Sequence, residues 1–273
     1  MSRAFDVALY ETAETAVCTR AWAPEPVPRY EQQEIFGETM TGSETNPTSD
    51  VERLIAIGDI HGCNVALQAL IEEIDPQPAD VIVALGDYVD RGPDTRGVLD
   101  TLVELGTRTR LVGIRGNHEE MMLSVLHEGA PHHEWLRHGG VETLESYGFD
   151  GDLDFLPPDH EKFLESLGDY FVAENFFFTH AAYDPDVALE NQPPDMLRWY
   201  PLTEGLPARH RSGMTAVVGH TANRDGEILD AGHLVCLDTY CYGGGWLTAM
   251  EMKTRSIWQA SREGQLRAVG RNA

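Results

Sequence analysis

The sequence predicts an α/β protein in which two mixed β-sheets pack together with helices outside. Two observations support this fold class. Residues 53–126 repeat an order of apolar run, polar loop and helical periodicity three times, which is typical of adjacent parallel strands connected by helices. Residues 170–260 instead contain short apolar runs with few helical stretches, which indicates a second half made mostly of strands.

Each of the three repeats begins with a short apolar run that ends in Gly and a polar residue. The runs are RLIAIGD, DVIVALGD and RLVGIRGN, and the helical segments NVALQALIEEI, TRGVLDTLVEL and HEEMMLSVL follow them. We expect a strand at residues 81–85 and Asp94 as the cap of the helix that follows. Parallel strands end at the same edge of a sheet, so the three polar loops are expected to meet.

The second half begins with a helical insert. Residues 135–167 have helical periodicity, interrupted by glycines at 139–140 and prolines at 157–158, so we expect short helices beside the edge where the loops meet. The strand-like runs that follow are YFVAENFFFTHAA, TAVVGHT, EILDAGH, LVCLDTY, WLTAMEM and SIWQA.

Residues 1–50 differ from the rest of the chain in composition and periodicity. They are rich in Glu, Thr and Pro and have no sustained period of helix or strand, which is typical of a flexible extension or a tail that binds a protein partner. Residues 51–273 are then expected to form one folded domain.

Charge and composition narrow the classes of partner. The chain has 45 acidic and 20 basic residues and a formal net charge of −25, so its far field repels polyanions. We therefore expect neither nucleic acid nor a membrane as a partner. No stretch reaches the roughly 20 apolar residues of a membrane span. The N-terminus lacks the basic start and apolar run of a signal peptide, so we expect a cytoplasmic location.

Side chains that can bind metals follow five of the predicted strands. Three loops read GDIHG (58–62), GDYVDRG (86–92) and GNHE (116–119), and two later strands end in FFFTHAA and VVGHT. Carboxylate, amide and imidazole donors suit Mn, Fe or Zn. Any one motif would also fit a helix cap or a structural histidine. Six such donors at one edge of a sheet indicate a pair of metal ions.

In this order the motifs resemble the signature of the phosphoprotein phosphatases within the calcineurin-like metallophosphoesterases. The resemblance covers about residues 53–260, and WLRHGGVETLESYG is similar to the insert of the bacterial serine/threonine phosphatase-like branch. It implies a four-layer sandwich, with residues 51–273 as a metallophosphoesterase domain. It also implies two divalent metal ions, with Mn expected and Fe or Zn as alternatives.

The resemblance implies six metal ligands, which are Asp59, His61, Asp87, Asn117, His180 and His220. Asp59 and His61 would hold the first metal, Asp87 would bridge both, and the other three would complete the second. A bridging anion makes physical sense, because two dications roughly 3.5–4 Å apart repel each other strongly. In this family a hydroxide that bridges the two metals attacks phosphorus in line.

The same resemblance implies the groups that assist the reaction. His118 would be the general acid that protonates the leaving group, and Asp90 would fix its tautomer and favour its cationic form. Arg91 would bind the phosphoryl oxygens, because a planar guanidinium can donate two hydrogen bonds to them. Each charged residue of the GDYVDRGPD segment thus has a predicted role. Asp87 binds metal, Asp90 positions the general acid, Arg91 binds phosphate and Asp94 caps the helix.

Some side chains keep two readings. The family has a second phosphate-binding arginine, and Arg198 is the candidate for it. Arg198 stands before Trp199, whereas the bacterial branch commonly has this arginine after the tryptophan. A structural role fits Arg198 equally, with Arg209 and Arg211 as substitutes for the phosphate role. Tyr240 and Tyr242, in the Gly-rich loop DTYCYGGGW, could line the pocket, but packing is the expected role.

The predicted function is metal-dependent hydrolysis of a phosphomonoester, with a phosphoserine or phosphothreonine protein or peptide as substrate. The alternative is a symmetric diadenosine tetraphosphatase or another nucleotide pyrophosphohydrolase, which is similar in its motifs. The insert lacks a basic cluster for nucleotide phosphates, which favours the monoester. A third hypothesis is a non-catalytic metal-binding scaffold that recruits partners through its N-terminal tail.

Overall fold

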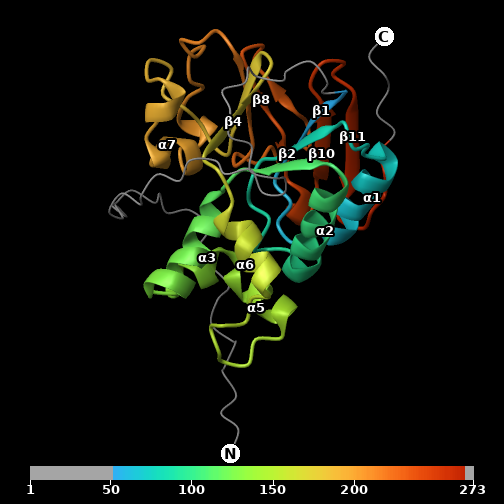
Figure 1. The fold of residues 1–273 in the computed structure, drawn as a ribbon. Coiled ribbons are helices and arrows are strands. Elements are labelled where there is room, and N and C mark those ends of the chain that lie inside the picture. Colours follow the sequence, from blue (N-terminus) through green and yellow to red (C-terminus); the bar gives the residue numbers. More distant parts are fainter. Residues whose placement is uncertain (1–51, 268–273) are drawn as a thin grey trace, which may run out of the picture. The chain divides into compact units, whose positions relative to one another are not determined.

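The structure is a computed structural model that describes residues 52–267 of the 273-residue chain. Within this range two mixed β-sheets pack face to face, and helices cover their outer faces (Figure 1). The predicted α/β fold with four layers is therefore confirmed. The predicted extension, residues 1–50, lies outside the described residues.

The first sheet has the strand order β11-β10-β1-β2-β3, and β9 also pairs with β10. Its strands are β1 (Leu54–Ile57), β2 (Val81–Ala84), β3 (Arg110–Gly113), β9 (Asp238–Thr239), β10 (Trp246–Glu251) and β11 (Ile257–Ser261). β1, β2 and β3 are parallel, as predicted. β10 pairs with β1 in antiparallel orientation. Strands from both halves of the sequence therefore form this sheet.

The second sheet has the order β4-β5-β6-β8-β7. Its strands are β4 (Tyr170–Ala173), β5 (Phe176–Thr179), β6 (Thr215–Val218), β7 (Leu229–Asp230) and β8 (Leu234–Cys236). The three central strands are parallel and the two edge strands antiparallel. The parallel strands β5 and β6 therefore end at the same edge, and the residues that follow them are neighbours.

Both faces of the first sheet are buried, which explains why its central strands read as continuous apolar runs. Leu54 and Ala56 of β1 face the second sheet and pack in one cluster with Val217 of β6. Ile55 and Ile57, at the alternate positions, pack with the helices on the other side. A third cluster covers the outer face of the second sheet. The core therefore fills three spaces between four layers.

The helices and helical turns are α1 (Asn64–Ile74), α2 (Thr95–Arg108), α3 (Asn117–Glu128), α4 (His133–Trp135), η1 (Leu136–Gly140), α5 (Val141–Tyr147), α6 (Pro158–Glu165), η2 (Leu189–Asn191), α7 (Pro194–Arg198), η3 (Leu202–Glu204) and η4 (Cys241–Gly243). Asp94 caps α2 as predicted, accepting a hydrogen bond from the Gly97 backbone N–H at 2.9 Å. None of the helices within residues 52–267 combines the length and apolarity needed to cross a bilayer.

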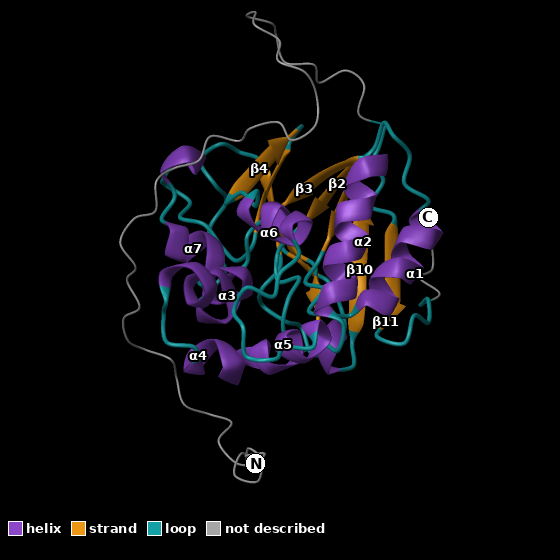
Figure 2. Cartoon of the chain, turned by 60° about the horizontal axis from the view of Figure 1, so that its bottom comes forward, coloured by secondary structure: helices purple, strands orange, loops and turns teal. Residues whose placement is uncertain are grey.

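The predicted insert consists of α4, η1, α5 and α6. Figure 2 shows α4 next to α3, which it contacts, and α5 packs against α2. The expected break at the glycine pair is a π-helical turn in which Gly139 has a φ of 109°. A Cβ on Gly139 would lie 2.5 Å from the Arg91 backbone nitrogen, so only glycine lets the insert approach the β2–α2 loop this closely.

Candidate active site

The six predicted metal ligands meet at one edge of the two sheets. Each follows the C-terminal end of a parallel strand: Asp59 and His61 follow β1, Asp87 follows β2, Asn117 follows β3, His180 follows β5 and His220 follows β6. All except His220 are buried. Parallel strand order thus gathers donors that the sequence spreads over more than 150 residues.

Asp87 lies at the centre of this group. Its Oδ2 atom is 3.4 Å from His61 Nε2 and 3.9 Å from His118 Nε2. Its Oδ1 atom is 3.4 Å from His180 Nε2. The two carboxylate oxygens therefore face two separate sets of possible metal donors, one with His61 and His118 and one with His180 and His220. This position is what a bridging ligand requires.

Hydrogen bonds fix which nitrogen of each histidine is available to a metal. His61 and His180 each place Nδ1 on a backbone carbonyl oxygen, at 2.9 and 2.8 Å. His220 does the same with Nε2, at 3.1 Å. A carbonyl oxygen only accepts, so these ring nitrogens donate and the opposite nitrogen of each neutral ring presents a lone pair.

These lone pairs point toward one another. His180 Nε2 lies 3.2 Å from His220 Nδ1, and Asn117 Oδ1 lies 3.1 and 3.0 Å from the two nitrogens. Burial lowers the pKa of His180, and it lowers the pKa of His220 to about 4, so both rings are neutral near pH 7. Facing lone pairs repel, and a cation between them would relieve the repulsion. The donor set therefore fits a divalent metal.

Clustered carboxylates add to the attraction for cations. Burial raises the pKa of Asp59, and the charges of Asp238 and Asp87 raise it further. Burial likewise raises the pKa of Asp238 to about 6. Asp59 also accepts the His220 backbone N–H at 2.9 Å, which joins the loops of the two sheets. The sequence analysis did not assign Asp238, although it follows β8 as the other aspartates follow their strands.

His118 and Asp90 form the predicted pair. His118 Nδ1 lies 2.7 Å from Asp90 Oδ2, so its Nε2 atom faces the metal donors. The helical insert holds Asp90 in place, because Trp135 Nε1 donates to it at 3.0 Å and Thr143 Oγ1 at 2.7 Å. Both bonds come from the segment WLRHGGVET, whose part in positioning Asp90 the sequence analysis did not foresee.

Burial acts against the positive charge that His118 would carry as a general acid. Asp90 was expected to favour the cationic form of His118. Burial instead lowers the pKa of His118 well below its usual value, and the charges of His61 and Arg91 lower it further. Removing a charged imidazole from water is costly, which explains the direction of this change. A negatively charged phosphoryl group beside the ring would act in the opposite direction.

Arg91 points into the same space. Its backbone N–H donates to Gly139 O at 3.2 Å, and its Nη1 atom is 3.3 Å from His61 Nε2. The Tyr242 hydroxyl accepts from Nη1 at 2.8 Å, and the Arg91 Cζ atom lies 4.6 Å from the centre of the Tyr242 ring. Tyr242 therefore lines the site, which was the second of its two predicted roles.

Arg198 does not fit the predicted role in phosphate binding. Its Nη1 atom donates to Glu120 at 3.1 Å, and Nε and Nη2 donate to Asp169. Two carboxylates thus neutralise this guanidinium, so the structural reading of Arg198 is the one that its contacts support. Arg209 and Arg211, the possible substitutes, donate to backbone carbonyl oxygens at 3.0 and 3.2 Å and are exposed.

Glu119 shapes the loop that carries Asp87. Its buried carboxylate accepts the backbone N–H groups of Asp87, Tyr88, Val89 and Gly116 at 2.7–3.2 Å. Burial raises the pKa of Glu119, while these four bonds favour the carboxylate. The residue belongs to the GNHE motif, but the sequence analysis gave it no role, because its partners come from another loop.

Replacing Glu119 with Gln is expected to lower the free energy of unfolding by about 2 kcal/mol or more, since part of the fan of backbone N–H donors would face an amide NH₂ group. The melting temperature should fall by roughly 4–8 °C. Thermal unfolding by circular dichroism measures this. Glu128→Gln, at the exposed end of the same helix, is the matched control, and equal melting temperatures for both variants would contradict the argument.

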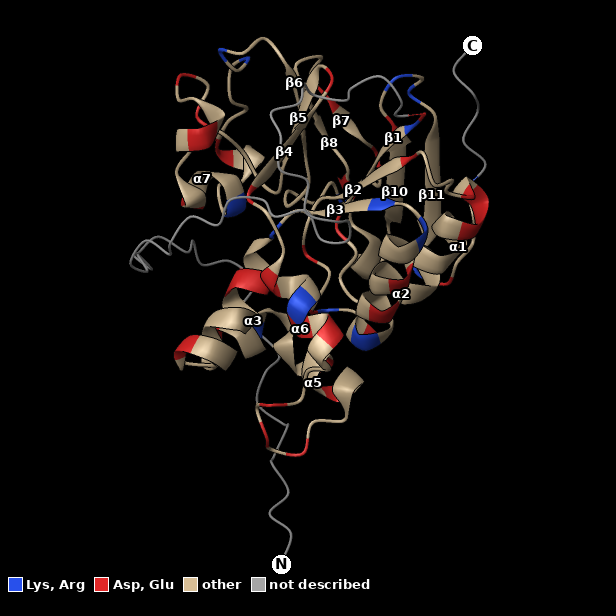
Figure 3. Cartoon of the chain, viewed as in Figure 1, with Lys and Arg blue, Asp and Glu red and all other residues tan. Residues whose placement is uncertain are grey.

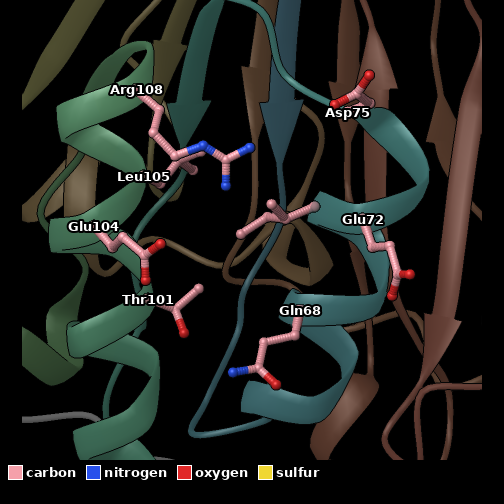
Figure 4. Close-up of a pocket in the computed structure, with 8 residues that line it drawn as sticks. Gln68, Glu72, Asp75, Thr101, Glu104, Leu105 and Arg108 are labelled. Atoms are coloured by element: carbon pink, nitrogen blue, oxygen red, sulfur yellow. The ribbon is translucent and has the colours of Figure 1, made fainter.

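A separate groove of about 390 Å³ lies between α1 and α2 (Figure 4). Its walls carry Glu72, Asp75, Glu104 and Arg108. It contains none of the side chains predicted for chemistry, so it has no part in the site described above.

Comparison with known proteins agrees with this site. A family model described as calcineurin-like phosphoesterase matches residues 52–246. Serine/threonine-protein phosphatase 1 of Salmonella typhimurium is 41% identical over 86 residues, which are 31% of this chain and 37% of that protein. The symmetrical bis(5'-nucleosyl)-tetraphosphatase of Cellvibrio japonicus is 25% identical, over 76% of this chain and 98% of that protein.

A solved structure shows the same fold. It is a crystal structure provisionally assigned as a diadenosine tetraphosphatase, with a TM-score of 0.61 and 23% identity over 78% of this chain and 94% of that chain. The family model covers nearly all the described residues, including every predicted metal ligand. The chain therefore belongs to the calcineurin-like phosphoesterase family.

Proposed function

We propose that the chain hydrolyses dinucleoside polyphosphates such as diadenosine tetraphosphate symmetrically, yielding two nucleoside diphosphates. The observation that carries this proposal is the extent of the match to symmetrical bis(5'-nucleosyl)-tetraphosphatases. It spans 98% of the Cellvibrio protein and 94% of a Legionella pneumophila protein that is 27% identical. This hypothesis was the alternative in the sequence analysis, and the extent of the match now makes it the leading one, ahead of phosphomonoester hydrolysis.

Protein phosphatase activity is the second candidate. The 41% identity to the Salmonella serine/threonine phosphatase favours it, but that match covers little more than a third of the enzyme. The insert has no basic cluster, and this absence favoured a phosphomonoester substrate. This preference is weaker now, because the predicted phosphate-binding residue Arg91 lies on the β2–α2 loop and not in the insert. The proposed phosphate contact of Arg91 needs no basic side chain from the insert.

The proposed ligands would hold two divalent cations, which supply an acidified water and polarise the phosphoryl oxygens. The chain's own groups do the rest. Arg91 would orient the reacting phosphate through its guanidinium. In its protonated form, which the charge of a bound phosphoryl group favours, His118 would pass its Nε2 proton to the leaving oxygen as the P–O bond breaks, while Asp90 holds the ring at Nδ1. Water adds to one phosphorus, and both products leave as nucleoside diphosphates.

The test compares two substrates with one protein. Metal-stripped protein is reloaded with Mn and given diadenosine tetraphosphate or a phosphothreonine peptide at equal concentration. The proposal expects ADP from the dinucleotide at a higher kcat/KM than inorganic phosphate from the peptide. Preference for the peptide would reverse the order of the two candidates. Formation of AMP and ATP in place of ADP would refute symmetric cleavage.

A further inference from the structure

Tyr240 has an unusual backbone conformation beside the site. Its φ and ψ are 66° and 43°, in the left-handed region that favours glycine. The structure describes nine non-glycine residues with positive φ, and Tyr240 shares this feature with five predicted site residues: His61, Asp87, Asp90, Arg91 and His220. Strain of this kind gathers at functional sites, which raises the question of what the Tyr240 side chain does.

The Tyr240 ring is held in one place. A Cβ on Gly243 would lie 2.0 Å from the ring's Cζ atom, so the ring packs against that glycine. The Tyr242 ring meets it edge-on, with 4.9 Å between the ring centres. The Arg224 Cζ atom lies 5.5 Å from the centre of the Tyr240 ring. The ring is therefore a platform for the Arg224 guanidinium.

Together these side chains form a row that starts at the proposed phosphate site. Arg91 contacts Tyr242, Tyr242 contacts Tyr240, and Tyr240 contacts Arg224. The Tyr242 ring also lies edge-on to His61, with 4.9 Å between the ring centres. One end of the row is thus among the metal donors, and the other end carries a second arginine.

Several arginines of this acidic molecule are neutralised by carboxylates. Arg198, Arg255 and Arg267 each pair with a carboxylate, and acidic residues are frequent on helices such as α1 and α3 (Figure 3). Arg224 is exposed and forms no ion pair within residues 52–267. Its charge is therefore available to an anion of the substrate.

We propose that Arg224, positioned by Tyr240, binds the phosphate of the leaving nucleoside diphosphate that takes no part in the reaction. This inference rests on the proposed function and adds a group to it. A substrate that extends past the reacting phosphate along the row would meet a guanidinium at its end. A phosphomonoester, which has one phosphate, would reach Arg91 and leave Arg224 unused.

Direct binding tests this role. ADP and inorganic phosphate are titrated by calorimetry into Mn-loaded wild type and into Arg224→Gln. Loss of a charge-assisted hydrogen bond is expected to weaken ADP binding roughly 10-fold, with phosphate binding unchanged. Arg137→Gln, an exposed arginine of the insert, is the control and should bind both ligands as the wild type does.

The role of Tyr240 is tested by a measurement that separates positioning of Arg224 from an effect on stability. Tyr240→Gly should weaken ADP binding in the same way, while removing backbone strain and keeping the melting temperature at least as high. Tyr240→Phe, which keeps the ring, should bind ADP as the wild type does.

Unchanged ADP affinity in Arg224→Gln would overturn the inference, as would a wild type that binds ADP no better than phosphate. The proposed function has its own test in the cleavage of diadenosine tetraphosphate. A wild type that cleaves the dinucleotide while Arg224→Gln binds ADP normally would sink only the role of Arg224.

Discussion

Replacing Asp87 with Asn is expected to weaken binding of both metal ions together, each by more than about 100-fold, because loss of a group that only orients a ligand already costs about 10- to 100-fold. The reason lies in the position of the carboxylate, whose two oxygens face His61 and His180 at 3.4 Å. An amide offers one oxygen in place of two and carries no charge. Metal content after dialysis, by plasma mass spectrometry, gives the result directly.

The matched control for this change is Asp154→Asn, on an exposed segment of the insert. It removes the same charge from the molecule and should retain the metal content of the wild type. Two tightly held metal equivalents in the Asp87 variant would show that the carboxylate does not bridge. Loss of a single equivalent would place Asp87 in one metal site only.

Replacing His118 with Asn is expected to slow hydrolysis most where the leaving group is most basic. General acid catalysis contributes about 10²- to 10⁴-fold, and asparagine cannot supply the proton. Phenyl phosphate, whose leaving phenolate is the more basic, should lose more kcat than p-nitrophenyl phosphate. The His118 backbone N–H donates to Asp87 Oδ1 at 3.2 Å, and this bond survives the change.

The comparison of the two aryl phosphates separates acid catalysis from general damage to the site. A variant with a distorted site would lose the same factor on both substrates, and that outcome would remove His118 from the acid role. His133→Asn is the control, since the His133 side chain is 62% exposed and lies outside the motifs. Its rates should equal those of the wild type on both substrates.

Local pattern was sufficient for the outline of the fold. The alternation of strand and helix in residues 53–126 predicted parallel β1, β2 and β3, because a parallel pair needs a crossover connection of this length. The same reasoning placed Asp59, Asp87 and Asn117 at one edge. It did not predict that β10 and β11 complete this sheet, because antiparallel pairing across the whole chain leaves no mark on short-range periodicity.

Partners of individual side chains were beyond the reach of local pattern. Arg198 stands in a segment similar to one that carries a phosphate-binding arginine, yet Glu120 and Asp169 neutralise it. Glu119 was read as one letter of a motif, although it organises the loop of Asp87. In both cases the role depends on carboxylate and donor positions that only the packed molecule defines.

Consecutive residues specify the type of each donor and its place at the end of a strand, since hydrophobic periodicity and the order of the strands can be read along the chain. Which donors face one another depends on the packing of the folded molecule. Asp59 meets the His220 backbone across 161 residues, and Arg91 meets Tyr242 across 151. Contacts over such separations arise from the packing of two sheets and an insert, and no neighbouring residues encode them.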